Sequence, residues 1–496
     1  MRIGFDMIAV QSPHHGHRGI GRYTKLLVSA LLARDDGHRY ILYAHDELPD
    51  HRIPTGPRAE VRRLRPAPER GEATVVHRVD RLARTNPDAL DVLVVTSPFE
   101  HWADYLPPAH PRNGLKLAAI VYDMIPFLFQ SEGVYDPLLM RYYRILEELR
   151  RYDALLAPSG STERDCTKLL GLPEGRVVNI SGATDGRLFV PDPSEPMPEA
   201  SRRVLHELGI TRPFVLNVGG LDERKNSWRL LDAFAQLPER LRRDVQFVMT
   251  FSITPSCRAE VVEFARRIGI GDQLILTGEV GDEALRVLYQ RCAMFVLPSL
   301  YEGFGLPLLE AMSCGAVVVA GNNSSQVEVV GDAGLMVNAS DTGDIAAKIA
   351  QVLERPGLAR ALKQRALGQA RQFSWGRTAE RTIEVLNGLG AREPAARPRL
   401  RLRADVGHAL KPRIAFFSPF PPRKSGISDY SAFLLHELNH FYRIDLYHDL
   451  GYVPELSLAS DEFPCCDARL FGRYAGVKDY HAVVYQMGNS RYHSYM

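Results

Sequence analysis

A glycine-rich loop between a buried strand and a helix, at residues 294–315, constrains the fold of this chain more than any other feature. The stretch opens on four apolar residues, the pattern of a short buried strand. Gly303 and Gly305 then indicate a loop, and Pro307 suits the first turn of a helix. Amides at a helix N-terminus favour an anion, so the backbone of Phe304 and Gly305 is predicted to bind phosphate.

Two glutamates accompany this loop. Glu302 precedes the turn, and Glu310 lies about one helical turn inside the predicted helix, so both carboxylates can point into one cleft. Carboxylates are poor phosphate ligands but good acceptors for sugar and ribose hydroxyls. The combination predicts a nucleotide-sugar pocket.

The run from Glu302 to Glu310, Glu-Gly-Phe-Gly-Leu-Pro-x-x-Glu, closely resembles the signature of family 4 retaining glycosyltransferases with the GT-B fold. The resemblance implies an α/β fold of two Rossmann-like parallel-sheet domains that face a cleft. It places Glu302 at the donor sugar and Glu310 at the ribose hydroxyls. It also implies donor contacts from the loop residues Gly303, Phe304, Gly305 and Leu306.

Composition limits the class of protein. At 496 residues the chain is long enough for two to four domains, and its 45% hydrophobic and 24% charged residues are typical of a soluble globular protein. A net charge of +2 indicates no nucleic-acid partner. The N-terminus enters a strand pattern at once, unlike a signal peptide. No apolar stretch reaches the roughly 18 residues of a membrane span, and the six scattered cysteines suit a reducing compartment.

These features predict a cytoplasmic protein. Arginine clusters at residues 58–70 and 392–403 favour solvated faces or linkers, with peripheral contact to anionic lipid at the inner membrane as the alternative.

The first half of the chain has the pattern of a parallel α/β domain. Residues 2–8, 40–44, 92–96 and 117–122 indicate buried strands. The sequence Gly-Ile-Gly-Arg-Tyr that begins at Gly19 resembles the family's glycine loop, which approaches the donor diphosphate or the acceptor. It lacks a complete Gly-x-Gly-x-x-Gly, which argues against a nicotinamide-dependent dehydrogenase. Three histidines in the preceding loop have no carboxylate partner, so we predict no metal site there.

The end of the strand at 117–122 departs from the family. Its members usually carry His-Asp at this position, whereas this chain has Tyr122 and Asp123. An obvious catalytic imidazole is therefore missing, and His101, after the neighbouring strand, is a substitute candidate. Asp123 can bind an acceptor hydroxyl or a donor sugar, or cap the next segment. Tyr122, Asp123 and His101 form the predicted acceptor side.

A second sheet is predicted to begin with the strand at residues 214–218. The strand leads into Gly219 and Gly220, and then into Arg224 and Lys225, a run closely similar to the family's Gly-x-x-x-x-Arg-Lys-Asn element. Arginine can bind two phosphate oxygens with its forked donors, and lysine adds a point charge. Further strands are predicted at residues 245–250, 273–277, 294–297 and 316–320, and the resemblance places the nucleotide base near Val280.

Proline-rich residues 191–201 cannot hold regular structure and suggest a hinge. Near the C-terminus, Arg-Ile-Ala-Phe-Phe at 413–417 and Gly-Ile-Ser-Asp-Tyr at 426–430 repeat the character of the N-terminal strand and glycine loop. We expect the truncated start of a second glycosyltransferase N-terminal domain there; the alternative is a small accessory domain. The predicted organisation is an acceptor domain at 1–190, the hinge at 191–201, a nucleotide-sugar donor domain at 202–372, a helix crossing back at 373–389, a linker at 390–411, and the partial third α/β segment at 412–496.

The resemblance thus implies a retaining, metal-independent hexosyltransferase that needs no cofactor, with Arg224, Lys225, Glu302 and Asp123 as the catalytic residues. The surrounding segments look most like bacterial mannosyltransferases of O-antigen or capsule synthesis. We therefore expect GDP-mannose as donor and a saccharide or lipid-linked saccharide as acceptor, in lipopolysaccharide biosynthesis or a polysaccharide-assembly complex. The alternatives are a glucosyl or N-acetylglucosaminyl transferase that uses a UDP-sugar, and an inactive GT-B module, which Tyr122 favours.

Overall fold

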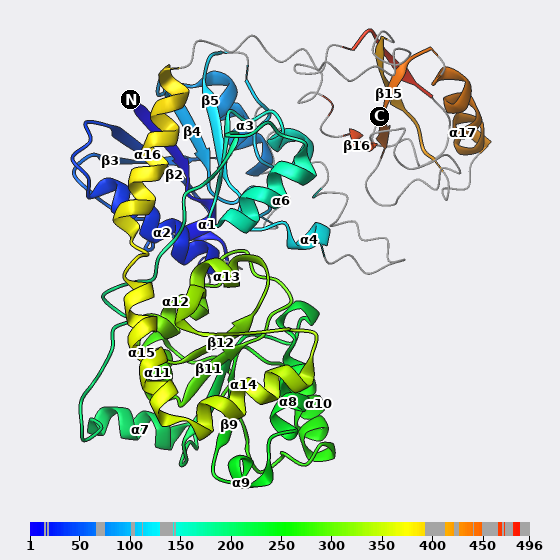
Figure 1. Cartoon of the computed structure of the whole chain (residues 1–496). Coiled ribbons are helices and arrows are strands. Elements are labelled where there is room, and N and C mark those ends of the chain that lie inside the picture. Colours follow the sequence, from blue (N-terminus) through cyan, green and yellow to red (C-terminus); the bar gives the residue numbers. More distant parts are fainter. Residues whose placement is uncertain are drawn as a thin grey trace.

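A computed structural model shows the architecture of the chain (Figure 1). It describes residues 1–13, 16, 19–65, 75–100, 105–111, 113–128, 142, 145–391, 412–420, 426–439, 441–448, 465–468, 471 and 480–486. Within these residues, every strand pairing is parallel, in three separate sheets. Parallel sheets covered by helices bury both faces, which explains why most of the inner strands are continuous apolar runs rather than alternating ones. The predicted α/β fold with two Rossmann-like domains is confirmed.

The N-terminal domain is built on a sheet with the strand order β3-β2-β1-β4-β5-β6-β7. Its strands are β1 (Arg2–Asp6), β2 (Arg39–His45), β3 (Ala59–Leu64), β4 (Val92–Val95), β5 (Lys116–Ile120), β6 (Ala154–Ala157) and β7 (Val177–Asn179). The helices are α1 (Ile8–Gln11), α2 (Gly19–Leu32), α3 (Val75–Thr85), α4 (Ile125–Leu128) and α6 (Gly160–Leu170). The strand order reverses beside β1, and ligands in open α/β sheets bind beyond the carboxyl ends of strands at such a point.

The second domain carries a sheet with the order β10-β9-β8-β11-β12-β13. Its strands are β8 (Phe214–Val218), β9 (Gln246–Thr250), β10 (Leu274–Leu276), β11 (Met294–Leu297), β12 (Val318–Gly321) and β13 (Leu335–Val337). Its helices are α7 (Glu199–Glu207), η3 (Glu223–Lys225), α8 (Ser227–Ala235), α9 (Glu239–Arg242), α10 (Pro255–Arg267), α11 (Asp282–Arg291), α12 (Leu306–Ser313), α13 (Ser324–Val330), η4 (Gly331–Ala333), α14 (Thr342–Glu354) and α15 (Pro356–Ala370).

Helix α16 (Trp375–Ala391) returns from the second domain to the first and lies beside α2 (Figure 1). It buries Ala379, Ile383 and Leu386 in the same hydrophobic cluster as the first strands of the N-terminal domain. At its start, the indole Nε1 of Trp375 donates to the carbonyl oxygen of Thr184 at 3.0 Å. This helix therefore ties the two domains together.

Two sequence expectations differ from the structure. Residues 191–198 contain no helix or strand, but α7 begins at Glu199, inside the expected hinge, with Pro198 at its N-cap. The solvated face expected of the arginine cluster at residues 58–70 is present in its described part, but it includes the edge strand β3, which the sequence did not predict. Charged residues suit an exposed sheet edge, because they discourage pairing with another chain.

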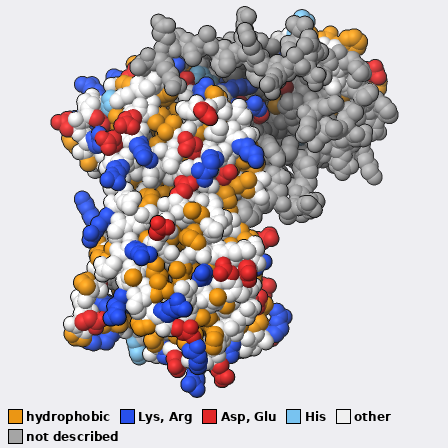
Figure 2. Space-filling model, viewed as in Figure 1, with side chains coloured by type: hydrophobic (Ala, Val, Ile, Leu, Met, Phe, Trp, Pro, Cys, Tyr) orange, Lys and Arg blue, Asp and Glu red, His pale blue; other side chains and the backbone are white. Residues whose placement is uncertain are grey.

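The arginines around β3 are paired with acidic residues. Arg63 lies 3.5 Å from Asp46 and also pairs with Asp50, and Arg62 lies 2.9 Å from Glu60. On the face drawn in Figure 2, basic and acidic side chains are interspersed over both domains. Within the described ranges, no helix is both long and apolar enough to cross a membrane.

The C-terminal segment repeats the start of the first domain. It contains β14 (Arg413–Phe417), α17 (Gly426–Leu438), β15 (Arg443–His448), β16 (Cys465–Asp467) and β17 (Ala482–Tyr485). The strand order β16-β15-β14-β17 reproduces the order β3-β2-β1-β4. The register repeats too, since the leading arginine of β14 faces the leading arginine of β15, as in β1 and β2. The partial third α/β segment is therefore confirmed as a fold, and its origin in a second glycosyltransferase stays a prediction.

Candidate functional site between the two domains

The pairing of β8 with β11 builds the donor-domain part of the site. These strands are parallel neighbours, so the segments that follow them leave the sheet at the same edge. Arg224 and Lys225 lie in η3 after β8, and Glu302 lies in the loop after β11. The structure thus brings together three predicted site residues that are 77 and 78 positions apart in the sequence.

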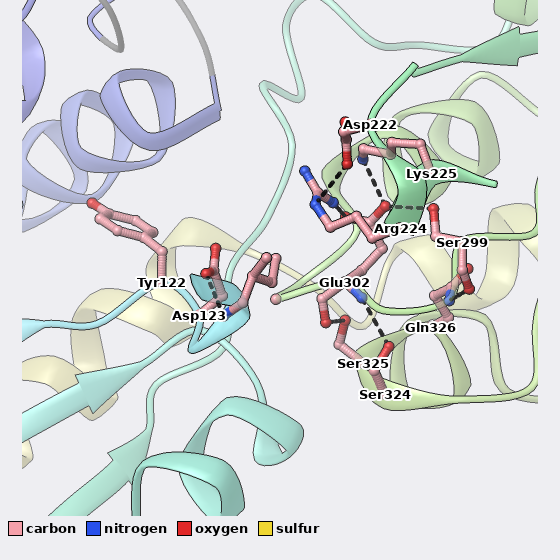
Figure 3. Close-up of polar contacts among 12 residues, drawn as sticks. Tyr122, Asp123, Asp222, Arg224, Lys225, Ser299, Glu302, Ser324, Ser325 and Gln326 are labelled. Carbon is pink, nitrogen blue, oxygen red and sulfur yellow. Dashed lines mark hydrogen bonds and ion pairs between the residues drawn. The ribbon is translucent and has the colours of Figure 1, made fainter. Parts of the chain in front are cut away.

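Glu302 is the centre of this charged cluster (Figure 3). Its Oε1 accepts from Lys225 Nζ at 2.6 Å and from Ser299 Oγ at 2.7 Å, and its Oε2 accepts from Arg224 Nη1 at 3.3 Å. Glu302 is only 6% exposed. Burial raises the pKa of its carboxyl, but the charges of Lys225 and Arg224 outweigh burial and leave the pKa below its usual value. The carboxylate is therefore ionised and holds both cations in place.

Hydrogen bonds to the backbone fix the two segments that carry the cluster. Asn226 follows the cations in a left-handed conformation, with φ at +60°, and its amide donates to the carbonyl oxygens of Pro298 at 2.9 Å and Ala339 at 2.6 Å. Asparagine tolerates this conformation better than most residues. The Glu302 backbone is held by α13, because Ser325 Oγ donates to its carbonyl oxygen at 2.8 Å and Ser324 Oγ accepts from its amide at 3.0 Å.

Gly303 lies where the donor loop packs against the N-terminal domain. A Cβ atom at this residue would lie 2.4 Å from the carbonyl oxygen of Tyr122 and 2.8 Å from Cβ of Asp123. The carbonyl oxygen of Gly303 accepts from Ser159 Oγ at 2.6 Å and from Thr162 Oγ1 at 3.1 Å, both at the start of α6. The donor loop therefore packs directly on the carboxyl edge of the N-terminal sheet.

Asp123 faces the cluster from the N-terminal domain (Figure 3). Its Oδ1 accepts from the amide of Ile125 at 3.0 Å, so the capping role considered from sequence is present. Burial raises the pKa of its carboxyl, while the charges of Arg224 and Lys225 lower it and that of Glu302 raises it. Asp123 is therefore placed within electrostatic reach of all three donor-side charges.

Tyr122 points away from the donor residues toward α2. Its hydroxyl lies 2.5 Å from Thr24 Oγ1, and its ring packs edge-on against Tyr23 with centroids 5.4 Å apart. Tyr122 supports the start of α2 and does not join the charged cluster. His101, the substitute candidate, lies outside the described residues.

The second glutamate, Glu310, has different partners. It lies on α12, is 7% exposed, and its Oε2 accepts from Tyr289 Oη at 3.2 Å. Its Oε1 lies 3.7 Å from Nη1 of Arg22, which belongs to the opposite domain. Burial raises the pKa of Glu310 to about 7, with the charge of Arg22 opposing the rise. Both predicted carboxylates therefore face the N-terminal domain. Glu302 lies opposite Asp123, and Glu310 lies beside Arg22.

The predicted glycines lie at the starts of elements. Gly305 is the N-cap of α12, with φ at +89°, so Phe304 and Gly305 directly precede a helix whose first amides have no partner within it. Gly19 opens α2, and a Cβ there would lie 3.7 Å from Leu306 at the start of α12. Gly219 and Gly220 link β8 to η3.

Val280 is not part of the charged cluster. It precedes α11 and packs, half-buried, against the hydrophobic core of the second domain. Its expected place beside a nucleotide base stays a prediction.

Sequence reasoning missed the residues that join the two domains. Arg22 lies inside the recognised glycine loop, whereas Ser159 and Thr162 lie at a serine-rich helix start outside the motifs named above. Tyr289 gave no signal, because an aromatic residue inside an amphipathic helix usually packs in the core.

Comparisons with known proteins divide the chain at the boundary between the two domains. Residues 17–185 match the family described as Glycosyltransferase Family 4, and residues 203–369 match the family described as Glycosyl transferases group 1. Sucrose-phosphate synthase from Thermosynechococcus elongatus has a similar structure, with a TM-score of 0.60 and 20% sequence identity over 78% of this chain and 99% of that chain.

Two curated relatives from Escherichia coli are similar in sequence. The serotype-specific mannosyltransferase WbdA is 33% identical over 300 residues, which cover 60% of this chain and 36% of that protein. The O-antigen chain mannosyltransferase B is 34% identical over 241 residues, which cover 48% of this chain and 61% of that protein. The chain therefore spans less than two thirds of the length of either relative.

Two Rossmann-like domains whose carboxyl edges meet around an Arg-Lys-Glu cluster define a glycosyltransferase of the GT-B type. The matched families and the loop from Glu302 to Glu310 agree with this class. Each of the two domains thus matches a glycosyltransferase family model, and the N-terminal domain matches that of family 4.

Proposed function

We propose that this protein is a retaining hexosyltransferase that moves mannose from GDP-mannose to a saccharide acceptor in the synthesis of a bacterial surface polysaccharide. The observation that carries the proposal is the cluster in which Lys225 and Arg224 pair with Glu302 opposite Asp123. Two adjacent cations at the edge of a parallel sheet can neutralise a diphosphate, while the carboxylates can accept hydrogen bonds from sugar hydroxyls.

The proposed chemistry depends on the charge that develops on the leaving group. As the bond between the anomeric carbon and the diphosphate oxygen breaks, Arg224 and Lys225 stabilise the negative charge that forms on the phosphate. The acceptor hydroxyl oxygen attacks the anomeric carbon from the same face, and the leaving phosphate oxygen takes the hydroxyl proton. Glu302 keeps the two cations oriented before the donor binds, and Asp123 orients the acceptor or the donor sugar.

The choice of mannose is supported by the two relatives from Escherichia coli, which are both mannosyltransferases by name. The guanine base is proposed on the overall resemblance to such enzymes. A lipid-linked form of the acceptor, contact with the inner membrane and a cytoplasmic location remain predictions from the sequence.

Isothermal titration calorimetry with GDP, UDP and NAD, in the presence of EDTA, tests the donor site without knowledge of the acceptor. We expect GDP to bind and Lys225→Ala to weaken binding at least about tenfold, because a charge-assisted hydrogen bond contributes roughly 1.5–3 kcal/mol. A preference for UDP would keep the enzyme class and reject mannose. A folded protein that binds neither nucleotide would reject the proposal in favour of an inactive module.

Turnover tests the transfer itself. Incubation with GDP-mannose and oligomannoside acceptors should release GDP and lengthen the acceptor with the α configuration of the donor retained, as judged by NMR of the product. The conservative variant Asp123→Asn should bind GDP as the unchanged protein does but transfer more slowly, since Asp123 lies on the opposite domain. Product of inverted configuration would contradict the same-face mechanism.

A further inference from the structure

The side chain of Arg22, in the N-terminal domain, reaches across to the donor domain. It lies in the first turn of α2, three residues after Gly19, which opens the helix. Its guanidinium pairs with Asp282, the first residue of α11, and its Nη1 lies 3.7 Å from Glu310 Oε1 on α12. One side chain thus links the glycine loop to two elements of the opposite domain.

The surroundings of Glu310 explain why this cation matters. The polar and titratable groups that face its carboxyl are Tyr289 and Asp282 on α11, Cys314 after α12, and Arg22. Tyr289 donates one neutral hydrogen bond, and Asp282 adds a like charge. Burial favours the protonated carboxyl, and the charge of Arg22 is the largest influence that favours the carboxylate.

The geometry also leaves hydrogen-bonding capacity on the carboxylate. An ionised carboxyl has about four lone-pair sites. Tyr289 Oη uses one site on Oε2, whereas Arg22 stands 3.7 Å from Oε1, outside hydrogen-bond range. The guanidinium therefore supplies charge to Glu310 without occupying the acceptor positions that a pair of ribose hydroxyls would need.

We propose that Arg22 is a positioning residue for the nucleotide, which holds Glu310 as a charged acceptor for the two ribose hydroxyls from across the domain boundary. The inference rests on the proposed function, in which Glu310 binds the ribose. Hydrogen bonds to a charged acceptor are stronger than those to a neutral one. Ribose recognition by the donor domain consequently requires the N-terminal domain to be closed over it.

The test compares the binding of GDP with that of 2′,3′-dideoxy-GDP, which lacks both hydroxyls, by calorimetry between about pH 5.5 and pH 8.5. The proteins are the unchanged chain, Arg22→Ala, Arg22→Lys and the matched control Arg164→Ala. Arg164 also forms an ion pair across the domain boundary, at 3.1 Å from Glu328. It lies on α6, whereas Arg22 lies on α2, and it is not among the groups that face Glu310. Thermal unfolding followed by circular dichroism checks that each variant is folded.

Above about pH 7, where Glu310 is ionised in the unchanged chain, we expect this protein to prefer GDP over the dideoxy nucleotide by at least about tenfold, the value of one charge-assisted hydrogen bond. Arg22→Ala should lose most of this preference, and its remaining GDP binding should rise only at higher pH, because Glu310 then ionises later. Arg22→Lys should restore the preference in part, since lysine returns the charge but not the forked geometry. Arg164→Ala should keep both the preference and the pH profile.

The outcomes separate this inference from the proposed function. If the unchanged chain prefers GDP over the dideoxy nucleotide and Arg22→Ala does so equally at every pH, the inference is wrong and the donor site stands. An equal loss in Arg164→Ala would also overturn it, because any interdomain ion pair would then have the same effect. If the unchanged chain binds no nucleotide, both the proposed function and the inference fail.

Discussion

Replacement of Gly303 by alanine tests whether the two domains must close on the donor loop. The new Cβ would lie 2.4 Å from the carbonyl oxygen of Tyr122 and 2.8 Å from Cβ of Asp123, distances at which one backbone must move. Both neighbours belong to the N-terminal domain, whereas Gly303 belongs to the donor domain. The clash therefore exists only in the closed arrangement, and separation of the domains relieves it.

The size of the effect follows from the cost of overpacking. One extra methyl group in a packed contact costs about 1–3 kcal/mol, which corresponds to a roughly 5- to 150-fold smaller ratio of closed to open protein. The variant would also displace the carbonyl oxygen of Gly303 from the hydroxyls of Ser159 and Thr162, which now donate to it at 2.6 Å and 3.1 Å. Each domain keeps its own core, so we expect little change in the unfolding temperature.

Two measurements on Gly303→Ala check this reasoning. Release of GDP from GDP-mannose should slow by the factor above, and small-angle scattering should show a larger radius of gyration. Gly186→Ala is the matched control, because a Cβ at Gly186 meets no atom within 4 Å. Turnover and scattering equal to those of the control would refute the argument that closure at this contact is needed.

Three further predictions follow from single contacts. Lys225→Ala removes the 2.6 Å partner of Glu302 and should lower the free energy of unfolding by about 2 kcal/mol in urea titrations; an unchanged midpoint would contradict the pairing. The folded pKa of Glu310 is raised from 4.5 to about 7, so its contribution to stability is complete below about pH 4.5 and is lost as the pH rises to about 7. Glu310→Gln should remove this loss, about 3 kcal/mol between pH 4.5 and pH 8, and an unaltered pH slope would count against a buried acid. Trp375→Phe keeps an aromatic ring but loses the 3.0 Å bond to Thr184, and should cost about 1 kcal/mol in thermal unfolding; an unchanged unfolding temperature would be inconsistent with this contact.

Local patterns were sufficient for most of the strands. Residues 214–218 and 294–297 were predicted with the bounds that β8 and β11 have, because apolar runs that end at glycine or proline are readily recognised. The edge strand β3 was not predicted, since its exposed arginines hide the apolar signal on which such reasoning depends. The start of α7 was missed because prolines obscure a helix that begins directly after one of them.

The sequence by itself determined the class of fold and the position of each charged group relative to its own strand or helix. It placed Arg224 and Lys225 after one strand, and Glu302 after another, because local periodicity and turn residues report local structure. Only the tertiary structure decided which groups meet: Glu302 with the two cations, and Glu310 with Tyr289 and Arg22. Such contacts depend on the pairing of β8 with β11 and on the closure of two domains, and neither is encoded in the spacing of residues within one segment.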